Sequence, residues 1–265
     1  MALKQHTDIS EMIRQQRENA AMYVLPFVEQ TLPIKSGIKV LEIGCGEGGV
    51  LKPFYDKGCL SVGVDLDGVR IDRAQDVFAT EIATGNMRIT LENVYDDAFK
   101  TKYKNFFDLI ILKDVIEHIP QQENFIPYLK TLLVPRGKVF FGFPPWYMPF
   151  GGHQQILISG WASKLPYYHL LPNFLYTGIM KMAGETKEKI DEMLEIKSTG
   201  INIERFEKIV NSSGFKIVSK QWFLINPIYK YKFGLNPKKQ NWLFGAVPYL
   251  RNFLTTCAYY TIEME

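Results

Sequence analysis

A short glycine-rich segment contains the residues of this sequence that are best suited to hold a cofactor. It reads VLEIGCGEGG over residues 40–49. Glycines between a strand and a helix let the backbone approach a ligand closely, and the following helix points N–H groups at it. Glu42 stands two residues before the first glycine, at the end of an apolar run. Because a buried carboxylate is costly without a partner, Glu42 predicts a ligand that carries a cationic group.

Two other interpretations of the same segment stay open at this point. Gly44, Gly46 and Gly49 also satisfy the GxGxxG pattern of nicotinamide-binding folds. Such a fold places a pyrophosphate at the turn, where the Glu42 carboxylate would repel it, whereas an amino group or a sulfonium would be attracted. Alternatively, Glu42 turns to solvent at the strand end and has no ligand.

The elements that must position this segment alternate between strand and helix up to Phe143. We expect strands at 38–43, 60–64, 87–91, 107–112 and 138–143, and helices at 9–31, near 50–51, at 67–78 and at 124–133. This alternation predicts a parallel sheet covered on both faces. Residues 145–200 break the pattern, and because a structureless loop of this length is rare, we expect an inserted helical lid. A helix at 203–210, a strand at 215–219 and a last strand near 255–262 complete the prediction.

The glycine segment and three later features resemble the class I S-adenosylmethionine-dependent methyltransferases. Residues 42–48, an acidic residue followed by GxGxG, are similar to motif I of this family. Asp65 lies 17 residues beyond Gly48, at the end of the second predicted strand, where the family uses an acidic residue. The segment 107–119 resembles the family's fourth strand and its turn, and residues 135–137 resemble the turn into the fifth strand.

The resemblance covers residues 36–145 well and residues 203–219 more loosely. It implies an α/β fold with a Rossmann-like, doubly wound, mostly parallel seven-stranded sheet, an antiparallel last strand and a helical lid insertion. The expected division is an N-terminal helix and cofactor-binding core at 1–144, an aromatic helical lid at 145–200 and a C-terminal completion of the sheet at 201–265.

The resemblance also implies the cofactor, S-adenosylmethionine, with S-adenosylhomocysteine as its product. Asp65 would accept hydrogen bonds from the ribose diol. Asn93 and Val94 would contact the adenine, although the family more often has Asp at the position of Asn93. Backbone around Leu112 and Lys113 would meet the methionine end. The predicted cofactor-binding residues are Glu42, Gly44, Cys45, Gly46, Asp65, Leu66, Asn93, Val94, Leu112 and Lys113.

Histidines are the candidate catalytic residues. Methyl transfer is an in-line displacement that depends on alignment, and a hydroxyl acceptor also needs a base, for which histidine suits neutral pH. His153 follows the fifth strand and two glycines, and we expect it to be the base or a substrate contact. His118 follows the fourth strand and is the second candidate, with packing of the turn as its alternative role. His169 is expected to be a satisfied lid residue and His6 part of the tail. No cluster along the chain has metal-ligand spacing, so no metal is predicted.

Composition limits the class of protein. Hydrophobic residues make up 46% and charged residues 22% of the chain, which excludes a disordered protein. Three cysteines without a CxxC pattern favour a reducing cytoplasm. The first residues lack the apolar segment of a secretory signal, and no run of 18 apolar residues predicts a membrane-spanning helix.

Charge is unevenly distributed along the chain. The net charge is only +3, yet no Asp or Glu occurs between Lys208 and Ile262, a stretch in which aromatic residues alternate with lysines. This pattern suits a peripheral membrane contact, and a solvated basic face is the alternative. Nucleic acid is not an expected partner, because no recognised RNA-binding module accompanies the pattern.

The sequence therefore predicts an enzyme that transfers a methyl group from S-adenosylmethionine to a small-molecule acceptor. An oxygen acceptor is favoured, on an apolar, lipid-linked, quinone-like or glycan hydroxyl, because the lid is rich in aromatic residues. The alternatives are a nicotinamide-dependent oxidoreductase and a non-catalytic S-adenosylmethionine-binding protein associated with membranes. We expect a cytoplasmic protein with or without membrane association.

Overall fold

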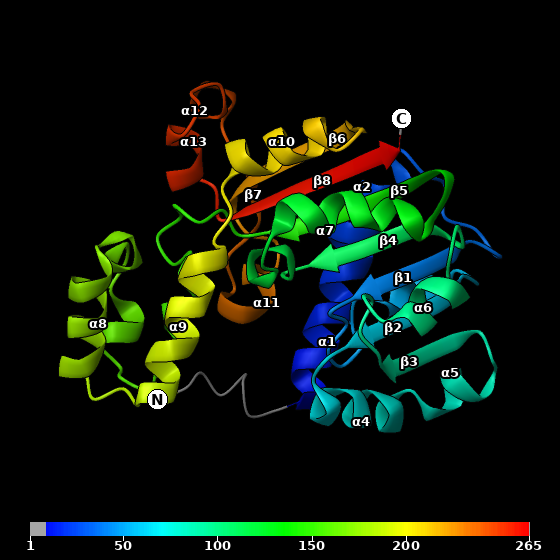
Figure 1. Ribbon diagram of the computed structural model, residues 1–265, viewed down its shortest axis with the longest axis horizontal. Helices are drawn as coiled ribbons and strands as arrows, with labels where there is room; N and C mark the ends of the chain where they lie inside the picture. Colours follow the sequence, from blue (N-terminus) through cyan, green and yellow to red (C-terminus); the bar gives the residue numbers. More distant parts are fainter. Residues whose placement is uncertain (1–8, 265) are drawn as a thin grey trace.

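The structure, a computed structural model, describes residues 9–264, so His6 lies outside the described residues. Its centre is one sheet with the strand order β3-β2-β1-β4-β5-β8-β6-β7 (Figure 1). The strands are β1 (Lys39–Ile43), β2 (Leu60–Asp65), β3 (Met87–Leu91), β4 (Phe107–Lys113), β5 (Leu133–Phe143), β6 (Phe215–Ile225), β7 (Lys238–Lys239) and β8 (Cys257–Met264). Strands β1 to β5 are parallel, and β8 runs antiparallel to both β5 and β6. The predicted fold class is confirmed. The two-residue β7 is an addition at the sheet edge.

Alternate residues of the central strands are buried on opposite faces of the sheet. Leu41 and Ile110 pack on one face, in the core that includes residues of α7 (Gln122–Tyr128) and α10 (Ile203–Ser212). Val40 and Ile111 pack on the other, against residues of the N-terminal helices and of the segments that follow β1 and β2. Burial on both faces explains why these strands read as continuous apolar runs in the sequence.

The helices of the core are short. Besides α7 and α10 they are α1 (Ile9–Asn19), α2 (Leu25–Glu29), α3 (Lys52–Asp56), α4 (Gly68–Val77), α5 (Ala79–Ala83), α6 (Asp97–Lys102), α11 (Tyr229–Phe233), α12 (Trp242–Gly245) and α13 (Leu250–Phe253). The single helix predicted at 9–31 is interrupted by a π-helical segment, Ala20–Val24. Helix α4 begins as predicted, because the Asp67 side chain accepts hydrogen bonds from the backbone N–H groups of Val69 and Arg70.

Strand β5 begins earlier than predicted. Leu133 already pairs with Phe107, and the next paired residues are Lys138 and Leu109. Residues 134–137 therefore bulge out of the sheet, with Arg136 at a φ of 63°. The proline and glycine in this segment mark the bulge and do not mark the start of the strand.

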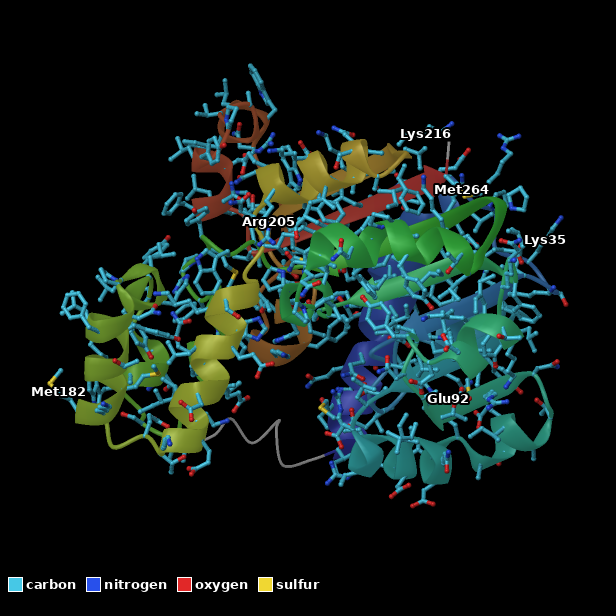
Figure 2. The ribbon with its side chains drawn as sticks, viewed as in Figure 1. Lys35, Glu92, Met182, Arg205, Lys216 and Met264 are labelled. Atoms are coloured by element: carbon cyan, nitrogen blue, oxygen red, sulfur yellow. The ribbon has the colours of Figure 1, made fainter. Side chains whose placement is uncertain are left out.

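Residues 145–200 lie between β5 and α10 and correspond to the predicted lid, and we refer to them by that name (Figure 1). Three 3-10 turns (Gln154–Ile156, Ala162–Lys164, Tyr168–Leu170) precede α8 (Asn173–Met182) and α9 (Lys187–Thr199). The lid has a hydrophobic cluster of its own, which contains Leu157, Ala162, Tyr168, Tyr176, Met180, Ile190, Met193 and Ile196. Met182 projects outward from the end of α8, away from the sheet (Figure 2). The division of the chain into three units stays a prediction.

The structure also bears on two expectations from composition. Cys45, Cys59 and Cys257 are all buried with free thiols. Among the described residues, no helix is long and apolar enough to cross a membrane.

Candidate active site

The turn after β1 is tied to the end of β2 by its own backbone. The N–H groups of Gly44 and Cys45 donate to the Val64 carbonyl at 2.8 and 3.0 Å. The N–H of Gly46 donates to Asp65 Oδ2 at 2.7 Å. Gly44 has a φ of +68°, and a Cβ there would lie 2.5 Å from a methyl carbon of Val115, so this position requires glycine. Since these three N–H groups already have acceptors within the protein, the turn is poorly suited to hold a pyrophosphate.

Glu42 is a buried carboxylate with one oxygen that is unpaired among the described residues. Its exposed fraction is 2%, and Oε2 has no hydrogen-bond partner in the described part of the chain. Burial, followed by the nearby Asp65 carboxylate, raises the pKa of Glu42 well above its usual value. Glu42 lines a cavity together with Gly44 and Lys113. A cationic group placed there would restore the ionised carboxylate. The site therefore fits the amino group of S-adenosylmethionine.

Two adjoining cavities contain most of the residues predicted to bind the cofactor. Glu42, Gly44, Cys45 and Lys113 line the first cavity. Gly44 also lines the second, which has a volume of about 460 Å³ and is lined further by Asp65, Leu66, Asn93 and Val94. The two remaining predicted residues line neither cavity: Leu112 is fully buried in β4, and Gly46 lies beneath the Arg70 guanidinium.

Two polar side chains of the second cavity also bond the backbone. Asp65 Oδ1 accepts from the N–H of Asp67 at 3.0 Å, in addition to the bond from Gly46 to Oδ2. Asn93 Oδ1 accepts from the N–H of Tyr95 at 3.0 Å. Carboxylate and amide oxygens have two acceptor sites each, so these groups retain capacity for a ligand. Their fixed orientation is what a preorganised ribose and adenine site needs.

Asp114 lines both cofactor cavities and was not singled out from the sequence. It directly follows β4 with a φ of 57°, and its N–H donates to the Gly142 carbonyl at 2.7 Å. Its carboxylate accepts a hydrogen bond from Lys113 Nζ. Burial of the Lys113 ammonium opposes its charge, but Asp114 holds the pKa of Lys113 above its usual value. The available signal was its position, since a polar residue at the end of a central strand lies at the ligand-binding edge.

Arg70 is a second residue that the sequence did not indicate. It lies on α4, and its Nη2 and Nε approach Glu47 Oε2 at 2.8 and 3.1 Å across the glycine turn. Arg70 lines both cofactor cavities. The Arg70–Glu47 pair thus fixes the outer side of the turn.

A third cavity begins where the cofactor cavity ends. It shares Asp114, Ile228 and Lys232 with the first cavity, so the two are contiguous. Its other lining residues come from the turns after β4 and β5, the lid, the segment after β6 and α11: Glu117, Pro144, Met148, Phe150, His153, Gln155, Ile156, Asn226, Tyr229, Phe233 and Thr256. It continues into an apolar cavity of about 420 Å³ lined by several of the same residues. We call these two together the acceptor cavity.

His118 and His153, the two candidate catalytic residues, lie side by side. Their ring centroids are 4.8 Å apart and the rings are nearly perpendicular. His153 lines the acceptor cavity, whereas His118 lines the second cofactor cavity. Burial lowers the pKa of His153 to about 4 and also lowers the pKa of His118. Burial therefore favours the neutral form of both imidazoles.

Glu117 completes this group and was missed in the sequence. Its exposed fraction is 3%, and Oε1 lies 3.8 Å from His153 Nε2. Within residues 9–264, neither carboxylate oxygen of Glu117 nor His153 Nε2 has a hydrogen-bond partner. Burial raises the pKa of Glu117 well above its usual value. We refer to Glu117, His118 and His153 as the polar cluster.

The lid fixes the turn that carries the polar cluster. Thr199, the last residue of α9, donates from Oγ1 to the Glu117 carbonyl at 2.7 Å. Gln122 Nε2 donates to the carbonyls of Ile116 and Thr199 at 2.9 and 2.6 Å. The side chains of Thr199 and Gln122 thereby join the end of the insertion to residues 116–118.

The backbone around His153 is unusual at the histidine and closely packed at the two glycines before it. His153 itself has the unusual conformation, with a φ of 56°, and the two glycines before it do not. Gly151 and Gly152 are required by close packing, because a Cβ would lie 2.2 Å from the Trp146 carbonyl oxygen and 2.4 Å from His169 Cβ respectively. His169 is a satisfied lid residue, as predicted: Nε2 lies 2.8 Å from the Trp146 carbonyl and Nδ1 3.3 Å from Gln154 Nε2.

Fold and site together define the class of protein. A sheet in this order, with a buried carboxylate ending β1, a glycine turn and a second carboxylate ending β2, is the arrangement of a class I S-adenosylmethionine-dependent methyltransferase. Residues 12–184 match the family model described as "Methyltransferase domain". The chain belongs to this family.

Individual relatives are more distant. The chain is similar to the ubiquinone biosynthesis O-methyltransferase of Leptothrix cholodnii, with 28% identity over 116 residues, or 44% of this chain and 48% of the relative. The matched region thus spans about half the length of the curated relatives. A putative sarcosine dimethylglycine methyltransferase from Galdieria sulphuraria has a TM-score of 0.59 at 11% identity, covering 93% of this chain and 85% of that one. Phosphoethanolamine N-methyltransferase 2 of Haemonchus contortus, in complex with S-adenosyl-L-methionine, has a TM-score of 0.55 at 15% identity, covering 91% and 51%. The two structures show the shared fold.

Proposed function

We propose that this protein transfers the methyl group of S-adenosylmethionine to a hydroxyl group on an apolar, quinone-like or lipid-linked small molecule. One observation carries the proposal. The acceptor cavity is contiguous with the cofactor cavity, is walled by Met148, Phe150, Tyr229 and Phe233, and has the polar cluster beside it. An apolar ring suits the wall, and its hydroxyl suits the cluster.

In this proposal the chain's own residues hold the cofactor by charge and hydrogen bonding. Glu42 faces the amino group, Asp65 the ribose diol, and Asn93 and Val94 the adenine. When bound, S-adenosylmethionine supplies an electrophilic methyl group on a sulfonium. Asp114 and Lys232 line the junction of the two cavities, where the acceptor and the methyl group meet.

His118 and His153 are the proposed catalytic residues. They activate the acceptor hydroxyl, because the attacking oxygen must lose its proton as its bond to the methyl carbon forms and the carbon–sulfur bond breaks. Alignment of the acceptor with the methyl group and exclusion of water account for the rest of the rate enhancement. The lid contributes Met148, Phe150 and His153 to the cavity wall, so it performs both tasks.

The name of the Leptothrix relative, a ubiquinone biosynthesis O-methyltransferase, supports an oxygen acceptor on a quinone-like ring. The match covers less than half of this chain. The acceptor preference itself rests on the cavity.

The test is methyl transfer by the full chain. We expect label from methyl-labelled S-adenosylmethionine in a lipophilic phenol or catechol, little in a hydrophilic catechol and none in an alkylamine of similar size. Transfer to the amine alone would contradict an oxygen acceptor. Binding of NADH without binding of S-adenosylhomocysteine would contradict the whole proposal. Binding of S-adenosylhomocysteine without transfer to any compound in a cell extract would favour the non-catalytic alternative.

We also propose a peripheral membrane contact through the basic, aromatic C-terminal part. Trp242, Leu243 and Phe244 support it, because all three are exposed on or beside α12, Trp242 to 77%. Three of the basic residues, Lys216, Lys220 and Arg251, are paired with Glu side chains and contribute less. We expect cosedimentation with phosphatidylglycerol vesicles, reduced in Trp242→Ser. No sedimentation with these vesicles would contradict the contact.

A further inference from the structure

The polar cluster has an unusual electrostatic feature. Only 3% of Glu117 is exposed, so it is 97% buried, yet neither of its carboxylate oxygens has a hydrogen-bond partner among the described residues. A buried carboxylate left in this condition costs several kcal/mol, as an order of magnitude. Its nearest polar neighbour, His153 Nε2, is also unbonded and lies 3.8 Å away. Two unbonded groups this close together are placed to share one further group as a common partner.

The distances in the cluster favour a cation as that third group. One ligand atom each from Glu117, His118 and His153 lies within 4.8 Å of the other two. A four-coordinate divalent ion takes nitrogen and oxygen ligands at about 2.0–2.2 Å, so its ligands lie about 3.4 Å from one another in a tetrahedral site. The 3.8 Å between Glu117 Oε1 and His153 Nε2 is close to this spacing, and the side chains of the cluster would move together to hold one ion. A proton acceptor, in contrast, would use one imidazole and leave the Glu117 carboxylate unexplained.

We propose that Glu117, His118 and His153 form a binding site for a divalent transition-metal ion at the inner end of the acceptor cavity. Two imidazoles and one carboxylate suit Zn²⁺, Fe²⁺ or Mn²⁺, whereas Mg²⁺ and Ca²⁺ prefer oxygen ligands. Three protein ligands leave positions open for the acceptor. The sequence predicted no metal because only the spacing of residues along the chain was available. His118 and His153 are 35 residues apart, which is not a metal-ligand spacing.

A bound ion would activate the acceptor hydroxyl. This part of the inference rests on the proposed function. An acceptor oxygen bound to the ion has a lowered pKa. Asp114, which lines the same cavity, would take the proton that the acceptor oxygen loses, and the oxygen would take the methyl group as the carbon–sulfur electron pair returns to sulfur. The redox state of the ion does not change. An acceptor with two neighbouring hydroxyls would bind the open positions through both oxygens.

The experiment titrates the full, metal-stripped chain with Co²⁺ and Zn²⁺. We expect one ion per chain, visible absorption bands from bound Co²⁺, and displacement of Co²⁺ by Zn²⁺. Glu117→Gln and His153→Gln should each weaken Zn²⁺ binding by at least about tenfold. Glu195→Gln is the matched control: this exposed carboxylate on α9 lies close enough to raise the pKa of His118 but is not a ligand, and its variant should bind as the wild type does.

The outcomes separate this inference from the proposed function. S-adenosylhomocysteine binding is measured on the same samples and should persist in Glu117→Gln, which would also show that the variant is folded. A wild-type chain that binds S-adenosylhomocysteine but no Co²⁺ or Zn²⁺ would overturn the metal site alone. Equal Zn²⁺ affinity in the wild type and Glu117→Gln would do the same. Failure to bind S-adenosylhomocysteine would overturn the proposed function instead.

Discussion

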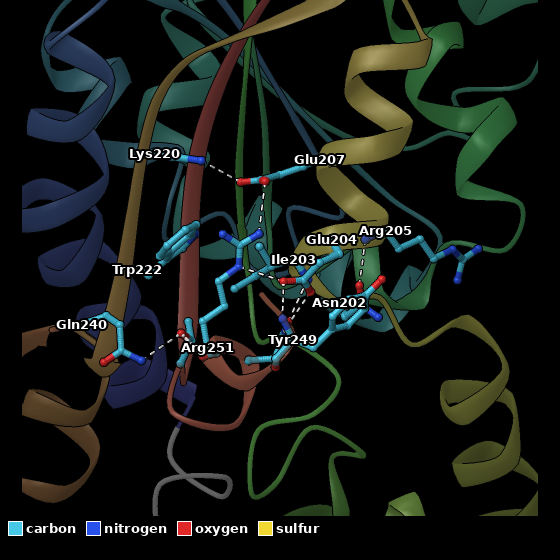
Figure 3. A network of polar contacts seen from close by, with 12 residues as sticks. Asn202, Ile203, Glu204, Arg205, Glu207, Lys220, Trp222, Gln240, Tyr249 and Arg251 are labelled. Carbon is cyan, nitrogen blue, oxygen red and sulfur yellow. Dashed lines mark hydrogen bonds and ion pairs between the residues drawn. The ribbon is translucent and has the colours of Figure 1, made fainter. Parts of the chain in front are cut away.

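Two polar regions of this protein differ in whether their carboxylates have hydrogen-bond donors. Between α10 and α13, Glu204 accepts hydrogen bonds from the Tyr249 N–H at 2.8 Å, from Arg251 Nε at 2.8 Å and from Asn252 Nδ2 at 2.6 Å (Figure 3). Glu207, one turn further along α10, accepts from Lys220, Arg251 and Tyr260. Each of these carboxylates has several donors. The C-terminal segment is therefore fixed to the sheet by a network that is complete within the chain.

The cofactor and acceptor cavities contain carboxylates of the other kind. Glu42 and Glu117 are more deeply buried than Glu204, and among described residues Glu42 Oε2 and both oxygens of Glu117 have no hydrogen-bond partner. A protein keeps such groups at a cost in stability where a ligand supplies the missing charge. The satisfied carboxylates thus hold the fold together, and the unsatisfied ones line the cavities where we propose that ligands bind. This difference predicts that substitutions in the two regions have opposite effects on ligand binding and on stability.

The largest effect is expected for Glu42→Gln. Affinity for S-adenosylmethionine should fall on the order of a hundredfold, because the ligand's amino group loses its charged partner. The free energy of unfolding of the ligand-free protein should change little, because Gln has nearly the size of Glu and burial already disfavours the ionised form of Glu42. Calorimetry and urea denaturation measure the two quantities. A Glu42→Gln variant that is less stable but binds normally would reverse the comparison.

Arg251→Ala should give the complementary result. It leaves Glu204 and Glu207 with fewer donors, so the free energy of unfolding should fall by about 2 kcal/mol. Affinity for S-adenosylhomocysteine should be unchanged, because Arg251 lines none of the cofactor cavities described above. Urea denaturation with a parallel binding measurement is the check. Lys238→Ala, an exposed position on β7, is the control for loss of a positive charge.

Asp65→Ala tests a carboxylate that combines both features, because Asp65 has hydrogen-bond donors within the chain and also a predicted ligand. It bonds the N–H groups of Gly46 and Asp67, and it faces the predicted ribose site. We expect affinity for S-adenosylmethionine to fall by more than about tenfold and stability to fall slightly. Asp65→Asn, which keeps an acceptor oxygen, should bind better than Asp65→Ala. Unchanged affinity in Asp65→Ala would show that the ribose contact lies elsewhere.

The smallest effect concerns pH and the lid. Burial lowers the pKa of His169 to about 4, with the Trp146 carbonyl opposing this shift and Lys197 adding to it. Because the folded-state pKa lies below the ordinary value of 6.5, the unfolded chain binds the proton first as the pH falls. Stability present above pH 6.5 should therefore be lost between about pH 6.5 and 4, by about 1 kcal/mol at pH 5.5. Thermal unfolding of His169→Gln should depend less on pH over this interval than that of the wild type.

The sequence predicted the fold and part of the site for a physical reason. Strands buried on both faces form continuous apolar runs, so β3 was predicted to the residue and β1, β2 and β4 within one residue at each end. Parallel strands end at one edge, so Glu42 and Asp65 were expected to converge, and they do line adjoining cavities. Their roles as cofactor contacts remain predictions.

Other features depend on contacts that periodicity does not encode. Glu117 faces His153 only because the lid returns to the turn after β4. Lys232 reaches the junction of the cavities because α11 turns back from β6, and its stretch of sequence indicated only a basic surface. The bulge at 134–137 resembles an ordinary turn in the sequence, because proline and glycine are typical of both.

The bonds from Thr199 and Gln122 to the turn at 116–118 have an evolutionary consequence. Insertions after the fifth strand are a convenient place for a protein lineage to vary the molecules it accepts. In this chain the same insertion supplies His153 and holds the backbone of Glu117. A descendant protein with a different insertion would also lose the hydrogen bonds that hold the turn of the polar cluster. In the proposed function, acceptor choice and activation of the acceptor would therefore depend on the same insertion.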